Sequence, residues 1–261
     1  MGFFKPNIRK MRINRDIEGL IIIFKHKDSR LILGAVEALK EIGKEAVESL
    51  LKALDDKNSS VRWYTARTLG EIGDENAIDC LIKTFMNDED ESVRDNAGSA
   101  LVDIGGERVR DELYKVVNKG DKNNIERAII RLGQLGDSRV VEQLIKWLKG
   151  KNKYAAASCL GFIGDIRAVE PLINALRTTE ISFKTDLVRS LGKIGDKRAL
   201  EPIKKQKIEI WSRRYEREYG EFFATDLYAH RKQFEEVASE AIKQIEEKKR
   251  SPINGSSLNL A

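Results

Sequence analysis

A short phrase recurs along most of the chain, and its spacing restricts the possible folds more than any other feature. In its fullest form an apolar segment ends in glycine, an aspartate follows and a second apolar segment begins, as in residues 160–173 (LGFIGDIRAVEPLI). The glycines that close successive copies are 28 to 32 residues apart: Gly43, Gly73, Gly105, Gly136, Gly164 and Gly195. A fixed period of this length with two helical segments in each unit predicts an α-solenoid.

The closing glycine and the aspartate after it have backbone reasons to recur. A helix that stops sharply before an antiparallel partner commonly needs a left-handed residue just past its end, which glycine supplies without steric cost. The aspartate can accept backbone N–H groups at the start of the next helix and oppose the helix dipole. A second glycine three residues before the closing one, as at Gly161 and Gly192, predicts that two helices approach closely there.

These residues resemble the HEAT-like repeat family in its short form, typical of the repeats first described in phycobilisome lyases. The resemblance rests on residues 160–173 and covers roughly 16–206. It implies an all-α fold, an α-solenoid (superhelix) of about six HEAT-like helix pairs with N- and C-terminal capping helices. The family includes scaffolds, bilin lyases, nucleic-acid binders and a metal-dependent hydroxylase branch, so the resemblance is specific for the fold and not for an activity.

The apolar pattern divides the chain into five parts. We expect a basic N-terminal segment with a partial repeat at 1–15, the repeat array at 16–206, an aromatic and arginine-rich insertion at 207–232, a terminal capping helix at 233–248 and a disordered tail at 249–261. The first helices of the pairs are expected near 30–42, 60–72, 92–104, 124–135, 153–163 and 182–194. The second helices are expected near 45–55, 75–87, 107–118, 138–149, 166–177 and from 197 onward.

The composition points to a chain without a membrane segment. The longest apolar run, Leu20 to Phe24, is too short to span a bilayer, and no secretory signal precedes it. Cys80 and Cys159 lack metal-ligand spacing and are expected to be buried apolar residues in a reducing compartment. We therefore expect a cytoplasmic location, no cofactor and no membrane association.

Basic residues are concentrated at the N-terminus. The formal net charge is +5 at pH 7, and residues 1–15 carry five basic residues and no acid, which accounts for the whole excess. The remaining chain is balanced between acids and bases. A dedicated nucleic-acid reader usually carries one broad basic face, so nucleic acid is the less favoured partner.

Two rows of charged residues align along the second helices. The acidic row is Glu48, Asp79, Asp111, Glu142, Glu170 and Glu201. Four positions further on stand Lys52, Lys83, Lys115, Lys146, Asn174 and Lys205. An acid and a lysine at i, i+4 form a favourable pair, so one interpretation is a salt-bridged, solvated face. The alternative is a striped surface that recognises a complementary protein, with Lys83, Lys115 and Lys146 as candidate partner-binding residues.

Other charged residues are expected to have structural or solvated roles. A row of arginines stands three residues past the closing glycines, with Asn76 at the equivalent place in one repeat: Arg108, Arg139, Arg167 and Arg198. Together with the turn aspartates, this row resembles the hydrogen-bond ladder between repeats of this family. The charged loops 88–91 (DEDE) and 149–153 (KGKNK) are expected to be solvated.

The regular period fails after Gly195, and residues 207–232 contain six aromatic residues interleaved with arginines. One interpretation is a longer helical hairpin whose aromatic side chains pack on the last repeat. The alternative is a partner site, because tryptophan, tyrosine and arginine dominate binding hot spots. Its candidate residues are Trp211, Arg213, Arg214, Tyr215, Phe222 and Phe223.

No catalytic constellation is visible in the sequence. His26 and His230 are followed by Lys27 and Arg231, whereas the hydroxylase branch of the family uses His-Glu pairs as iron ligands. No phosphate-binding glycine loop, thiol–histidine arrangement or zinc spacing is present. The sequence therefore predicts a non-enzymatic scaffold that binds another protein through the concave face of the solenoid, the aromatic insertion or both.

Two alternatives stay open. A nucleic-acid-binding HEAT-like protein would use the basic N-terminus and the arginine and aromatic insertion. A lyase-like enzyme subunit resembling bilin lyases would hold its chromophore between protein surfaces. Apart from the shared repeat, nothing in the sequence argues for that activity.

Overall fold

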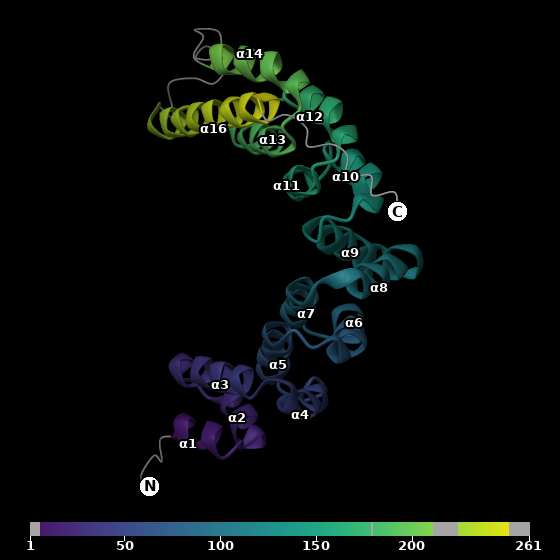
Figure 1. Ribbon diagram of the computed structural model, residues 1–261, viewed down its shortest axis with the longest axis vertical. Helices are drawn as coiled ribbons and strands as arrows, with labels where there is room; N and C mark the ends of the chain where they lie inside the picture. The colour runs from purple at the N-terminus through teal and green to yellow at the C-terminus, as the bar shows by residue number, and fades with distance from the viewer. Residues whose placement is uncertain (1–5, 179, 211–223, 251–261) are drawn as a thin grey trace, which may run out of the picture. The chain divides into compact units, whose positions relative to one another are not determined.

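The computed structural model describes residues 6–178, 180–210 and 224–250, and within these ranges it contains helices and no strand (Figure 1). The chain divides into two compact units, Met1–Leu135 and Gly136–Ala261. Each unit is built from helices that follow one another in the predicted order of first and second helices. The predicted all-α solenoid of helix pairs is confirmed.

In the first unit, the first helices stack on one another in chain order: α3 (Ser29–Ile42), α5 (Ser59–Ile72), α7 (Glu91–Ile104) and α9 (Lys122–Gln134). The second helices pack against the first helix that follows them: α4 (Val47–Ala53), α6 (Ile78–Asn87) and α8 (Gly106–Lys119). The 3₁₀ turns η2 (Gly43–Ala46) and η3 (Glu75–Ala77) lead into α4 and α6. Two short helices, α1 (Ile8–Ile13) and α2 (Ile17–Ile22), pack on α3, and the 3₁₀ turn η1 (Ile23–Lys25) continues α2, so the array begins with N-terminal capping helices.

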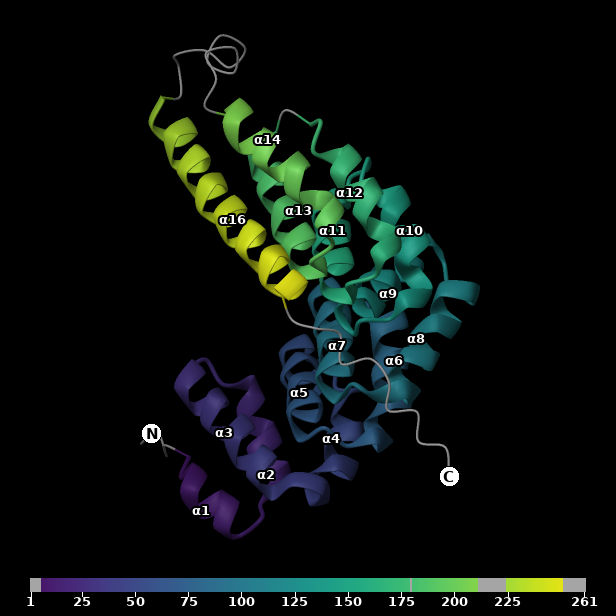
Figure 2. The same ribbon diagram turned by 45° about the horizontal axis from the view of Figure 1, so that its top comes forward.

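The second unit has the same two layers. Its second helices are α10 (Val141–Trp147), α12 (Val169–Ala175) and α14 (Leu200–Ile210), which follow the 3₁₀ turns η4 (Ser138–Val140), η5 (Ile166–Ala168) and η6 (Lys197–Ala199). Its first helices are α11 (Lys153–Ile163) and α13 (Ile181–Ile194), which pack against each other. The last helix, α16 (Ala224–Arg250), lies against α13 and α14 and takes the place of a further first helix (Figure 2).

Polar side chains and glycines set the helix ends. The first helices of the first unit begin after residues whose side chains accept a backbone N–H two positions on: Asp28, Asn58, Asp90 and Asp121. All six closing glycines have the positive φ that the sequence predicts. At Gly164 the dihedral angles are φ 74° and ψ 13°, in the left-handed region, and Asp165 accepts the backbone N–H of Arg167 at 2.8 Å. The turn therefore ends one helix and caps the next.

The C-terminal helix α16 closes the apolar core of the second unit. Phe234, Ala241 and Ile245 are almost completely buried against α13 and α14. A Cβ atom on Gly192 of α13 would lie 2.8 Å from the Cβ atom of Ala241, so the missing side chain permits the close approach of the two helices. The helix expected at 233–248 starts earlier, at Ala224, and α14 continues to Ile210. The division of the chain into five parts stays a prediction, and most of the predicted insertion and tail, residues 211–223 and 251–261, lies outside the described residues.

Within the described ranges, no helix is both long and apolar enough to cross a membrane.

Gly164→Val should lower the free energy of unfolding by about 2 kcal/mol, because a β-branched residue is strained in the left-handed region. In the described chain nothing lies within 4 Å of the position at which a Cβ atom would stand, so the backbone alone accounts for this cost. Gly164→Asn is the control, because asparagine tolerates this conformation and should lose much less stability. Equal losses for the two variants in urea denaturation would contradict the account of the turn.

Phe234→Ala should lower the free energy of unfolding by roughly 3–5 kcal/mol, because the ring is buried between α16 and the preceding repeat and its removal leaves a cavity. The neighbouring Gln233 is exposed, so Gln233→Ala should change stability by less than about 0.5 kcal/mol. Urea denaturation of both variants measures the difference. If Phe234→Ala were as stable as Gln233→Ala, α16 would not be an integral part of the core.

Candidate functional site

The acidic row belongs largely to contacts between repeats. Glu48 forms the expected pair with Lys52, with 2.9 Å between Oε1 and Nζ. In later repeats the acid binds an arginine of the next repeat instead: Asp79 accepts from Arg108 at 3.0 Å. The planar guanidinium group of Arg108 donates to both carboxylate oxygens of Asp79 and to the carbonyl oxygen of Glu75, a forked geometry that suits arginine better than lysine.

Arg167 shows how the arginine row links neighbouring repeats. Its guanidinium donates to Asp165 at 2.7 Å within its own repeat and to the carbonyl oxygen of Ser138 at 3.2 Å in the preceding one. It also donates to Glu142 of the acidic row at 3.4 Å. The hydrogen bond from Arg167 is the main reason that the pKa of Asp165 lies below its ordinary value. The predicted ladder between repeats is therefore present, and it includes members of the acidic row.

The lysine row is exposed on successive second helices. Lys83 on α6 lies 3.4 Å from Asp55, and Lys115 on α8 lies 2.7 Å from Glu112. Lys146 on α10 is exposed as well. Their predicted role in partner binding stays a prediction. The other candidates for that role lie outside the described residues: Trp211, Arg213, Arg214, Tyr215, Phe222 and Phe223.

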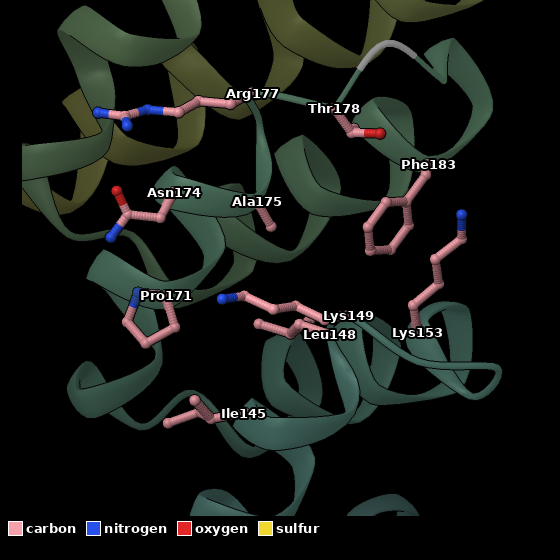
Figure 3. A pocket seen from close by; sticks show the side chains of 10 residues that line it. All are labelled: Ile145, Leu148, Lys149, Lys153, Pro171, Asn174, Ala175, Arg177, Thr178 and Phe183. Carbon is pink, nitrogen blue, oxygen red and sulfur yellow. The ribbon is translucent and has the colours of Figure 1, made fainter.

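A cavity of about 680 Å³ lies in the second unit where the lysine row is interrupted by Asn174. It is lined by Ile145, Leu148, Lys149, Lys153, Pro171, Asn174, Ala175, Arg177, Thr178 and Phe183 (Figure 3). Asparagine is much shorter than the lysine found at the equivalent positions of the other full repeats, so this position leaves space open. Pro171 stands in the first turn of α12, where a backbone N–H has no partner within the helix, and the helix continues unbroken to Ala175.

The cavity combines an apolar wall with a cationic edge. Leu148 and Phe183 are buried, and with Ile145, Pro171 and Ala175 they supply the apolar lining. Lys149 and Arg177 are exposed, and they form no ion pair with any residue in the described ranges. Figure 3 shows the ammonium group of Lys149 extending across the hollow toward the side that carries Pro171 and Asn174. Such a site suits a ligand with a flat apolar body and an anionic group.

Lys153 also lines the cavity, but its charge already has partners. Its ammonium group donates to Glu180 and lies 4.9 Å from the ring centre of Phe183 and 5.3 Å from that of Tyr154. The Tyr154 hydroxyl donates to Glu180 and lies 3.0 Å from Ser182 Oγ. The hydrogen bond from Lys153, followed by that from Tyr154, lowers the pKa of Glu180. This cluster, Lys153, Tyr154, Glu180, Ser182 and Phe183, fixes one wall of the cavity.

The sequence did not predict this site, because the basic loop at 149–153 was interpreted as solvated. Two of its lysines, Lys149 and Lys153, line the cavity instead. Two sequence features together mark the site: the basic loop 149–153 precedes the one full repeat in which the lysine row changes to Asn174. The acidic loop at 88–91 also differs from expectation, because Asp88 is buried with Arg62, with N–O distances of 2.8 and 2.9 Å.

Among the described residues, no group of three or more histidine, cysteine, aspartate or glutamate side chains is placed to hold a metal ion. Both cysteines are free thiols, and Cys159 is buried while Cys80 is partly exposed.

Two family models match the repeats. The model of HEAT repeats matches residues 17–101 and 81–154, which together make up more than half of the chain. The chain belongs to the HEAT-repeat family. The model of the PBS lyase HEAT-like repeat matches residues 153–178 and 185–206, which include the cavity lining from Lys153 to Thr178, while Phe183 lies between the two matched ranges. The predicted resemblance to HEAT-like repeats of the phycobilisome lyase type is confirmed.

Two curated relatives are proteins of bilin chemistry. Phycocyanobilin lyase subunit beta of Nostoc sp. (strain PCC 7120) is 33% identical over 97 residues, which are 36% of this chain and 48% of the relative. Bilin biosynthesis protein RpcF of Synechococcus sp. (strain WH8020) is 31% identical over 98 residues, which are 38% of this chain and 42% of the relative. The matches thus span about half the length of each relative.

Solved structures with related folds include the complex of CpcE and CpcF of phycocyanin lyase from Nostoc sp. PCC7120. The similarity has a TM-score of 0.45 and 19% identity, and it covers 85% of this chain and 94% of that one. Human deoxyhypusine hydroxylase in complex with glycerol follows, with a TM-score of 0.41, 16% identity and coverage of 93% and 100%. Values this low do not carry a function from either structure to this chain.

The curated relatives overturn the functional prediction. The sequence predicted a non-enzymatic scaffold, whereas the relatives at 31–33% identity are a lyase subunit and a bilin biosynthesis protein. They favour the lyase-like alternative and contradict the expectation that the chain is not an enzyme. The prediction rested on the lack of a recognisable set of catalytic side chains, and such a lack does not exclude an enzymatic role.

Glu180→Gln should destabilise the protein at neutral pH and much less in acid. The pKa of Glu180 is lower in the folded protein than its ordinary value of 4.5, so its stabilisation is present above that value and is lost as the pH falls through the folded pKa. The difference in Tm between the parent and Glu180→Gln should therefore shrink as the pH is lowered. Glu236→Gln, an exposed acid on α16, is the control. A difference in Tm that stayed constant with pH would contradict a role for the ionised carboxylate.

Proposed function

We propose that the chain is a lyase-like subunit that binds an open-chain tetrapyrrole, a bilin, and acts together with a protein partner. The observation that carries this proposal is the 33% identity to phycocyanobilin lyase subunit beta over 97 residues. The name of that relative describes one subunit of a lyase, which supports the need for a partner. The exposed lysines of the second helices, Lys83, Lys115 and Lys146, are proposed as part of the partner surface.

The cavity of the second unit supports this proposal by its size and chemistry. Small-molecule sites usually have volumes of roughly 300–1,000 Å³, and the cavity of about 680 Å³ lies within that range. Its apolar wall suits the flat pyrrole rings of a bilin, and its cationic edge suits the propionate carboxylates. We assign the chromophore to this cavity.

The purified chain should bind phycocyanobilin with a change in the visible absorbance band and an induced circular dichroism signal, because the protein fixes one conformation of a flexible chromophore. Ala175→Trp, which fills the cavity, should weaken binding at least tenfold, equivalent to about 1.4 kcal/mol. Lys146→Gln is the control, since Lys146 lies on α10 and does not line the cavity. Far-UV circular dichroism establishes that each variant is folded.

Two outcomes would count against the proposal. Absence of any spectral change at saturating bilin would contradict bilin binding itself. Equal affinities of the parent and a folded Ala175→Trp variant would show that the chromophore lies outside the cavity.

A further inference from the structure

We infer that Lys149 and Arg177 form a subsite for an anionic group at the edge of the cavity, and that this subsite recognises a carboxylate of the ligand. The assignment of the carboxylate to a bilin rests on the proposed function. The anion subsite itself rests on the positions and contacts of the two side chains.

The first argument is that these cations are not used by the fold. Lys153, the third cation of the cavity, is held by Glu180 and by the rings of Tyr154 and Phe183. Lys149 and Arg177 are exposed and have no ion pair among the described residues. An unpaired cation beside an apolar wall is available to a ligand, and a charged hydrogen bond there is stronger than in open solvent.

The second argument comes from the repeat register. Lys149 follows Leu148, the residue that caps α10, and Arg177 follows Leu176, the cap of α12. The two cations are 28 residues apart, as are Gly136 and Gly164, so they occupy one position in successive repeats. The residues at that position in the other repeats are Asp55, Met86, Asn118 and Ile208. The fold therefore does not require a cation there, and the two cations coincide with the cavity.

The third argument is the polar lining that comes from the same stretch of chain as Arg177. Asn174 and Thr178 line the cavity from the same stretch as Arg177 and offer neutral hydrogen-bond donors. Figure 3 shows the Asn174 side chain on the same side of the hollow as the Arg177 guanidinium. Phe183, Ile145 and Ala175 supply the apolar surface beside them. The ligand that matches this arrangement has an anionic oxygen group attached to a flat apolar body.

The test compares biliverdin with its dimethyl ester, which keeps the same apolar body and lacks the carboxylates. The full chain should bind biliverdin at least tenfold more tightly than the ester, and added salt should weaken biliverdin binding only. The double variant Lys149→Gln, Arg177→Gln should lose at least tenfold in affinity for biliverdin and keep its affinity for the ester. Lys193→Gln removes one positive charge from the exposed surface of α13 outside the cavity and should leave both affinities unchanged.

The outcomes separate this inference from the proposed function. If biliverdin and its ester bind equally, or if the double variant weakens both to the same extent, the anion subsite is overturned while bilin binding stands. If no bilin binds, the proposed function fails, and the aromatic sulfonate dye ANS then tests the subsite alone. ANS fluorescence that falls in the double variant and not in Lys193→Gln would support the subsite, whereas equal fluorescence would overturn it.

Discussion

Every other feature of this protein depends on a sharp turn between helices. At Gly164 the backbone is left-handed, and Asp165 then accepts the N–H of Arg167. An L residue with a side chain would be strained at the first position, and an apolar residue at the second would leave helix-start N–H groups without a partner. Because the aspartate of this turn plays the same part at Asp74, Asp137 and Asp196, equivalent residues of these repeats fall into register. The buried leucines then form one continuous core in each unit, and α16 completes that of the second.

The same register explains the charged surface. Arginines after several of the turns reach back to the preceding repeat, as Arg108 does to Asp79 and Arg167 does to Glu142, so part of the acidic row serves contacts between repeats. The lysines on the second helices remain exposed. In a repeat protein, a residue that differs from those at the equivalent positions of the other repeats is more informative about function than one that matches them. Asn174 is such a departure, and the cavity lies beside it.

The proposed ligand site needs no catalytic motif. Its apolar wall uses side chains that also belong to the core, such as Leu148 and Phe183. The partly exposed ion pair between Lys153 and Glu180 holds the wall in place, while Lys149 and Arg177 stay exposed. This arrangement suits a role in holding a chromophore, where shape and charge matter more than a nucleophile or a general base.

The sequence by itself determined the helices, their order and the turns, because these depend on local backbone preferences and on a period that repeats six times. The first helix predicted at 153–163, for example, coincides with α11. Only the tertiary structure decided which charges meet. Asp79 binds Arg108, which is 29 residues away in the sequence, and Lys153 binds Glu180, which is 27 residues away. At such separations the sequence pattern offers several equivalent partners for each charge. The cavity was undetermined for the same reason, since its lining joins two repeats and its volume depends on how closely their side chains pack.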